Sequence, residues 1–258
     1  MTFHRLKLGL KNLGRIVEIW HCFTLSMAPF RELLAYLQLV DLEYPYKLYL
    51  KNGAYLLLHD WQDLTTAWVV FYGKEYTLSA DDQIVIDCGA NIGAFTLFCA
   101  KYLPRAHIIA VEPFPANYRR LELTIQENAL IDFVTPVNAA VVGREGCIFM
   151  DDAIEIASHS RKIGGDKGVK VQGLTLEKIM NTYNIKEASF LKVDIEGAEY
   201  PLFAETPKEV LRRCQRIGLE YHGNGDTQAL FKHLKEAGFK QGRYPKKGAA
   251  GVVEFIRI

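Results

Sequence analysis

The chain has 258 residues, a length that fits one core domain with an appendage. Its formal net charge is +1 and 24% of its residues are charged, so no overall basic field points to nucleic acid as a partner. The five cysteines are odd in number and contain no C-x-x-C pair, which predicts reduced thiols in a cytoplasmic protein without a zinc site.

Residues 1 to about 40 are expected to be mostly helical, and no apolar run in the chain is long enough to span a membrane. Basic and apolar residues mix over the first 20 positions, and Arg15, Glu18 and His21 interrupt any signal-peptide core. Such a helix can make a peripheral contact with an anionic membrane or pack on its own domain. We favour packing on its own domain.

Two short apolar runs, residues 46–50 and 55–58, flank a turn that contains Asn52-Gly53. This pattern is the strongest short signal for a β-hairpin. A helix is expected over residues 60–72. Residues 1–80 are therefore interpreted as an accessory region of helices and a hairpin, placed to cap a ligand pocket.

The α/β domain is expected over residues 81–258. It opens with a β-branched strand that runs into the loop Asp87-Cys88-Gly89-Ala90-Asn91-Ile92-Gly93, followed by an apolar helix to about Tyr102. Gly89 permits a sharp turn, and Gly93 permits close packing of helix and strand. A strand, a glycine loop and a helix in this order are typical of a nucleotide-binding α/β unit.

Asn91 stands where a dinucleotide-binding loop has its second glycine, which a pyrophosphate requires. With Asp87 two residues before the first glycine, the loop suits a ligand that carries a positive charge and no phosphate. S-adenosylmethionine (SAM) is such a ligand. Glu112 ends the next expected strand, where an acidic side chain accepts hydrogen bonds from both ribose hydroxyls.

The rest of the domain continues the alternation of strands and helices. Strands are expected at 133–142, 189–194 and 215–221, helices at 115–127, 175–183 and 227–237, an inserted hairpin at 146–150 and 169–173, and a closing antiparallel pair at 239–244 and 252–258. Residues 153–168 are either a mobile substrate loop or a surface excursion. The pattern predicts a doubly wound, mostly parallel Rossmann-like α/β sheet with a C-terminal antiparallel hairpin.

Ligands of such sheets bind at the carboxyl ends of the strands. The expected strand ends bring together Asp87, Glu112, Asn138, Asp194 and residues 220–222. Because the sulfonium of SAM is positive, carboxylates are favoured near it, and Asp87 or Asp194 is expected at the methionine end. Asn138 suits a polar contact near the adenine.

Asp194 and His222 are the candidate catalytic residues. Each belongs to a pair of residues two apart, Asp194 with Glu196 and His222 with Glu220, so each pair is expected on one face of a strand. Either residue can assist loss of a proton from a substrate hydroxyl. The alternatives are helix capping and SAM positioning for Asp194 and a structural hydrogen bond for His222. The same residues are plausible metal ligands, but nothing in their spacing demands a metal, and none is predicted.

At this point the chain resembles the FkbM family of SAM-dependent methyltransferases. The resemblance covers roughly residues 45 to 225. Its most particular motif is Leu191-Lys192-Val193-Asp194-Ile195-Glu196-Gly197-Ala198-Glu199. The other matching segments are Val85 to Gly93, Glu112-Pro113 with Asn117, Leu121 and Asn128, Leu174 to Glu177, Glu220-Tyr221-His222, and Tyr76 after Gly73-Lys74-Glu75.

The resemblance implies a class I methyltransferase fold, SAM as methyl donor, and O-methylation of a hydroxyl on a sugar, glycan or natural product. A homodimer is compatible with it. A nicotinamide-dependent oxidoreductase and a non-catalytic methyltransferase-like partner module are the alternatives. Asn91 argues against the first, and the polar strand ends argue against the second. The candidate cofactor site consists of Tyr76, Asp87, Gly89, Ala90, Asn91, Gly93, Phe95, Thr96, Glu112, Pro113, Asn138 and Asp194.

Overall fold

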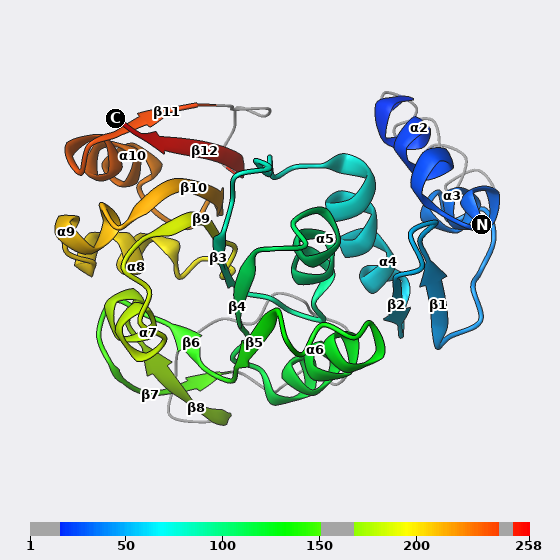
Figure 1. Cartoon of the computed structure of the whole chain (residues 1–258), viewed down its shortest axis with the longest axis horizontal. Helices are drawn as coiled ribbons and strands as arrows, with labels where there is room; N and C mark the ends of the chain where they lie inside the picture. The colour runs from blue at the N-terminus through cyan, green and yellow to red at the C-terminus, as the bar shows by residue number, and fades with distance from the viewer. Residues whose placement is uncertain (1–15, 151–167, 243–249) are drawn as a thin grey trace.

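The protein is described by a computed structural model over residues 16–150, 168–242 and 250–258 (Figure 1). Its centre is a seven-stranded sheet in the order β11-β12-β10-β9-β3-β4-β5. The five strands from β5 to β10 are parallel, and β12 is antiparallel to both of its neighbours. The predicted sheet is confirmed. Its strands are β3 (Ile84–Cys88), β4 (His107–Val111), β5 (Val134–Val137), β9 (Ala188–Val193), β10 (Cys214–Tyr221), β11 (Phe239–Gln241) and β12 (Gly251–Arg257).

Helices cover both faces of this sheet, because successive residues of its strands point to opposite sides. Val85 and Ile108 belong to the hydrophobic cluster beneath α5 and α6, whereas Ile86 and Ile109 belong to the cluster beneath α7, α8 and α10 (Figure 1). The helices of the domain are α5 (Ala94–Tyr102), α6 (Pro115–Glu127), α7 (Leu176–Thr182), α8 (Glu199–Glu205), α9 (Lys208–Leu211) and α10 (Thr227–Glu236).

The accessory region packs against α5 and shares its hydrophobic cluster. It consists of α2 (Ile16–Leu25), α3 (Pro29–Tyr36), the hairpin of β1 (Tyr46–Tyr49) and β2 (Tyr55–Leu58), and α4 (Trp61–Ala67). The hairpin is confirmed. The helix expected to reach Tyr72 changes into a π-helix, η1 (Trp68–Gly73), which places Trp68, Phe71 and Tyr72 in the core.

Helix α2 packs on η1, in agreement with the favoured interpretation of the N-terminal segment from Ile16 onward. The Trp68 indole donates to the Glu18 carboxylate over 2.9 Å, and the His21 ring lies 2.7 Å from the Tyr72 carbonyl. Residues 1–15 and most of the segment expected at 153–168 lie outside the described residues. Within the described ranges, no helix is long and apolar enough to cross a bilayer.

The single strand expected over residues 133–142 is divided in two. Its first half is β5 of the central sheet, and its second half, β6 (Ala140–Val141), joins a smaller sheet with β7 (Gly146–Met150) and β8 (Val169–Leu174). The break falls at Asn138, whose side-chain amide donates to the carbonyls of Glu112 and Pro113 over 2.9 and 3.1 Å. The inserted antiparallel pair of β7 and β8 is confirmed.

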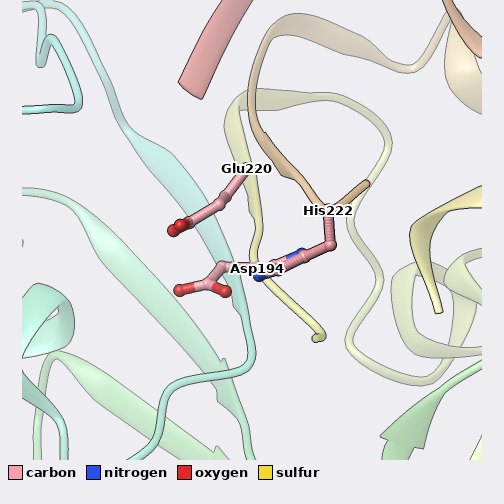
Figure 2. A group of neighbouring side chains, drawn as sticks. All are labelled: Asp194, Glu220 and His222. Atoms are coloured by element: carbon pink, nitrogen blue, oxygen red, sulfur yellow. The ribbon is translucent and has the colours of Figure 1, made fainter. Parts of the chain in front are cut away.

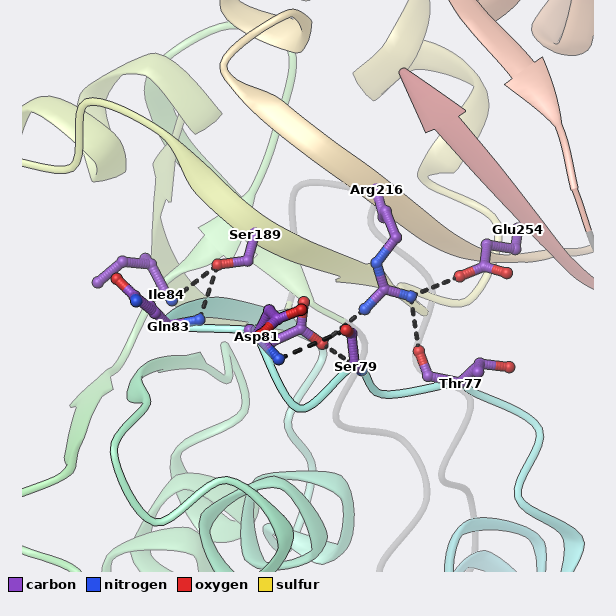
Figure 3. A network of polar contacts seen from close by, with 9 residues as sticks. Thr77, Ser79, Asp81, Gln83, Ile84, Ser189, Arg216 and Glu254 are labelled. Atoms are coloured by element: carbon purple, nitrogen blue, oxygen red, sulfur yellow. Dashed lines mark hydrogen bonds and ion pairs between the residues drawn. The ribbon is translucent and has the colours of Figure 1, made fainter. Parts of the chain in front are cut away.

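A polar network ties the segment between the accessory region and β3 to the central sheet (Figure 3). Arg216 on β10 donates to the Glu254 carboxylate on β12 over 2.7 Å, to the Thr77 carbonyl over 2.8 Å, and to Asp82. The Ser189 hydroxyl on β9 accepts the Ile84 amide over 3.0 Å. Because the Asp82 carboxylate is buried, Arg216 is the group that neutralises it.

Replacing Arg216 with methionine is expected to lower the free energy of unfolding by about 1.5–3 kcal/mol, because the charge-assisted hydrogen bonds to Asp82 and Glu254 are lost. Urea denaturation followed by circular dichroism measures the change. Lys232→Met is the control, since the Lys232–Glu236 pair is exposed and 3.9 Å long, and its removal should leave the midpoint near that of the unmodified protein. Equal midpoints for both variants would contradict the assigned role of Arg216.

Candidate active site at the carboxyl edge of the sheet

The glycine loop passes directly beside the end of β9. Gly89 has a φ of +80°, and a Cβ at this position would lie 1.8 Å from the Asp194 carbonyl oxygen. The Gly89 and Ala90 amides donate to the Val111 carbonyl at the end of β4 over 2.9 and 3.0 Å. The loop is therefore held between β4 and β9. Gly93 packs against Leu121 of α6, not against a strand as expected, since its Cβ would lie 2.9 Å from the Leu121 side chain.

Glu112 is buried at the end of β4, as predicted, and it faces the glycine loop. Its carboxylate accepts the Asn91 amide over 2.8 Å and the Phe114 amide over 2.9 Å. Burial raises its pKa to about 7, against the opposing effect of these two hydrogen bonds. A carboxylate has about four acceptor positions, so two remain for a ligand. The Asn138 side-chain amide donates to the Glu112 carbonyl and so holds the backbone of Glu112 in place.

The raised pKa of Glu112 predicts a pH-dependent cofactor affinity. Only the ionised carboxylate can accept hydrogen bonds from two ribose hydroxyls, so protonation below pH 7 should weaken binding of S-adenosylhomocysteine (SAH), the demethylated product. Binding at pH 6 is expected to be about tenfold weaker than at pH 8, as for one proton on a group of this pKa. Isothermal titration measures it. Glu112→Gln should bind weakly at both pH values, and an affinity of the unmodified protein that does not change with pH would contradict the prediction.

Lys192 is a buried cation beneath the loop. Its Nζ donates to the Gly89 carbonyl over 2.7 Å and lies 3.2 Å from Asp87 Oδ1 and 3.5 Å from Asp194 Oδ2. Burial disfavours its charged form, but the Asp87 and Asp194 carboxylates outweigh this effect and raise its pKa above the usual lysine value. Asp87 also accepts the Thr96 hydroxyl over 2.7 Å. Asp87 and Thr96 thus lie under the loop and support it.

Two pockets meet at the glycine loop. Glu112, Phe114, Asn117 and Met150 line the first, which we call the Glu112 pocket; Pro113 lies in the same wall. The second, the Tyr76 pocket, is covered by the accessory region and is lined by Thr65, Thr66, Val69, Val70, Tyr76, Ala90, Phe95, Lys192 and Glu220. Gly89, Asn91, Asp194 and Glu196 line both. A ligand that runs through both pockets would therefore pass Asp194.

The ends of β9 and β10 bring Asp194, Glu220 and His222 together, and their side chains point toward one another (Figure 2). One oxygen or nitrogen atom of each lies within 4.8 Å of those of the other two. The His222 ring contacts Glu199 through Nδ1 and lies 3.2 Å from Glu196 Oε2 through Nε2.

These surroundings shift the titration of all three residues. Hydrogen bonds to Glu196 and Glu199 raise the pKa of His222 to about 10. Burial, followed by the charge of Asp194, raises the pKa of Glu220 to about 8. Burial also raises the pKa of Asp194 above its usual range, although Lys192 opposes it.

Lys192, Glu199 and the pocket residues Thr65, Thr66, Val69 and Val70 received no role from the sequence. Lys192 did carry a signal, because it is a charged residue in an apolar strand whose six residues are all buried. Glu199 carried no such signal. Its role becomes visible only in the structure, where it begins α8 and contacts His222. Val69 and Val70 reach the pocket from the π-helix, which has no recognisable sequence pattern.

Comparison with known families identifies the family of the chain. A family model described as the methyltransferase FkbM domain matches residues 87–240, more than half of the chain. The chain belongs to the FkbM methyltransferase family. It is a SAM-dependent methyltransferase, and the cofactor and fold predicted from the glycine loop and the strand order are confirmed.

This FkbM methyltransferase is similar to several known proteins. A protein named Methyltransferase 1 from Beauveria bassiana is 28% identical over 66% of this chain and 78% of its own length. The antimetabolite synthetase AmbE of Pseudomonas aeruginosa is 41% identical over 66% of this chain, which spans 10% of that protein. The structure of M. jannaschii TYW2 in complex with AdoMet aligns with 85% of this chain and 90% of its own, at 17% identity and a TM-score of 0.43.

Proposed function

We propose that this methyltransferase transfers the methyl group of SAM to a hydroxyl oxygen of a small molecule, a sugar or another natural product. The observation that carries this proposal is the place of Asp194. It lines both pockets beside the glycine loop and belongs to a cluster with Glu220 and His222. A hydroxyl must lose its proton as its oxygen attacks a methyl group, and this cluster offers groups that can accept or hold that proton.

The proposed arrangement divides SAM between the two pockets. Adenosine occupies the Glu112 pocket, where Glu112 binds the ribose hydroxyls and Phe114 and Met150 supply apolar contact. The sulfonium lies beside Asp194, whose negative charge stabilises it. The acceptor enters the Tyr76 pocket beneath the accessory region. Such alignment is most of what an in-line methyl transfer requires.

The chemical step balances without an oxidant or a reductant. The acceptor oxygen forms a bond to the methyl carbon, and the carbon–sulfur bond breaks with its electron pair moving to sulfur, which yields SAH. The hydroxyl proton passes to the Asp194 carboxylate and then to water, because the raised pKa values of Glu220 and His222 keep these two groups protonated near pH 7. Similarity to a segment of a protein named an antimetabolite synthetase supports a natural-product acceptor.

Two measurements test the proposal. Isothermal titration with SAH should show micromolar binding and titration with NADH none; the reverse result would support an oxidoreductase. Incubation of the protein with methyl-labelled SAM and a panel of sugars and polyketides should then give labelled products with an O-methyl signal in their NMR spectra, whereas amines in the same panel should stay unlabelled. Transfer to nitrogen or carbon alone would overturn the proposed acceptor class.

His222→Ala is expected to lower kcat by about 10²-fold, because the protonated ring lowers the pKa of Asp194 and so keeps this proton acceptor ionised. Its affinity for SAH should stay near that of the unmodified protein, because His222 lines neither of the two pockets. Steady-state kinetics and titration with SAH give the two values. Equal losses of turnover and of SAH affinity would move His222 into the cofactor site. Glu236→Gln on the exposed face of α10 is the control.

A further inference from the structure

Carboxylates outnumber cations around Asp194. Among the described residues, Glu196 and Asp87 act electrostatically on Asp194, Glu75 acts on Glu220, and the cations that act on Asp194 are Lys192 and His222. Lys192 is already engaged by Asp87 and by the Gly89 carbonyl. Like charges gathered in a partly buried place are unfavourable unless a further cation balances them. A bound cation would balance these carboxyl groups in place of protons.

The three members of the cluster have the chemistry and the spacing of metal ligands. Asp194 and Glu220 each offer a carboxylate oxygen and His222 offers a ring nitrogen, all within 4.8 Å of one another (Figure 2). Two ligand atoms bonded to the same ion at about 2.1 Å lie at most about 4.2 Å apart. Small side-chain rotations would thus bring the set into one coordination shell.

Glu199 gives His222 the orientation that a metal-binding histidine has. Its carboxylate is fully buried and contacts His222 Nδ1, so Nε2 is the nitrogen that an ion can reach, and the ion would take the place of Glu196 Oε2, which lies 3.2 Å from it. A histidine that binds a metal usually donates its other ring N–H to a carboxylate in this way. The Tyr200 hydroxyl donates to the His222 carbonyl and fixes the backbone at this position.

An independent observation comes from Tyr76. Its side chain is 6% exposed and lines the same pocket as Asp194 and Glu220, yet its hydroxyl has no hydrogen-bond partner within the described parts of the chain. Burial, and then the charges of Asp194 and Glu220, raise its pKa, so the hydroxyl keeps its proton. A buried donor without a partner is costly and indicates a bound ligand, such as water or hydroxyl on an ion.

We propose that Asp194, Glu220 and Nε2 of His222 hold a divalent cation. This proposal differs from the sequence analysis, which predicted no metal. Three protein ligands leave positions open, as in catalytic metal sites. There the cation would bind the acceptor hydroxyl and lower its pKa, and the proton would leave directly for water instead of passing through Asp194 as the oxygen attacks the methyl carbon. This role rests on the proposed function, whereas the site itself does not.

Titration of the full chain with Mn²⁺, followed by the electron paramagnetic resonance signal of the free ion, tests the site. Mn²⁺ binds carboxylate ligands well and also accepts an imidazole ligand. We expect one tightly bound ion per chain and binding at least about tenfold weaker in Glu220→Gln. This change removes one of several like charges, so the fold should persist, and titration with SAH verifies it. Glu236→Gln is the matched control and should bind Mn²⁺ normally.

The results separate the two proposals. Absence of Mn²⁺ binding, or equal binding by the unmodified protein and Glu220→Gln, would overturn the site. Mn²⁺ binding that Glu220→Gln abolishes supports the site, even if no hydroxyl acceptor is ever methylated and the proposed function fails. Full methylation of a hydroxyl acceptor after dialysis against EDTA would overturn the catalytic role of the cation while the proposed function stands.

Discussion

Replacing Lys192 with methionine is expected to lower the free energy of unfolding by about 3–5 kcal/mol, the cost of breaking a buried ion pair from one side. The change leaves the fully buried Asp87 carboxylate without its cation and removes the hydrogen bond to the Gly89 carbonyl. Because that bond holds the glycine loop, SAH affinity should fall as well. Urea denaturation and isothermal titration measure the two effects.

A second variant separates charge pairing from packing. If Lys192 acts by neutralising Asp87, then Lys192→Met combined with Asp87→Asn should lose less stability than the sum of the single changes. Additive losses would mean that the lysine acts mainly through its aliphatic stem. Lys208→Met is the control for removal of a lysine charge, because its partner Glu236 is exposed and little change is expected there.

Gly89→Ala should be the most damaging single change in the cofactor site. An alanine at a φ of +80° costs about 1–2 kcal/mol, and relief of its overlap with the Asp194 carbonyl about 1–3 kcal/mol more, so a total of about 2–5 kcal/mol is expected. To relieve this overlap, the ends of β3 and β9 must move apart, and both pockets meet at this point. Loss of measurable SAH binding in a protein that still shows the circular dichroism of the fold is the expected result.

Gly53→Ala is the matched control. Gly53 also has a positive φ, +84°, but a Cβ there would meet no atom within 4 Å. It should therefore show only the strain of about 1–2 kcal/mol and keep full SAH affinity. If both variants bind SAH equally well, then the close approach of Gly89 to Asp194 is not needed for the cofactor.

Much of the fold could be predicted because its signals are local. The β-branched run before Gly89 and the Asn52-Gly53 turn each specify an element through the conformations their residues prefer. Parallel strands end at one edge, so the meeting of Asp194 with Glu220 and His222 also followed from the sequence. The expected strand-face pairs did not form, because β9 ends at Val193, β10 ends at Tyr221, and Glu196 has a φ of +53°.

What could not be predicted depends on contacts between distant segments. The strand expected over 133–142 is broken because Asn138 bonds to Glu112 and Pro113, which no local pattern reveals. Asp87 or Asp194 was expected at the methionine end of SAM, and no local pattern shows that Lys192, 105 positions from Asp87 in the chain, pairs with Asp87 beneath the loop. The two carboxylates on His222 likewise come from a segment that only the fold brings close.

The place of β12 has a consequence for biosynthesis. This strand, Gly251–Arg257, lies between β10 and β11 and pairs with both, although it follows them in the chain. During translation, the edge of β10 therefore stays open, and the layer that receives Val253 and Phe255 stays incomplete, until residue 257 has left the ribosome. An exposed strand edge invites pairing with other chains. The nascent protein thus needs protection from aggregation until β12 has paired with β10.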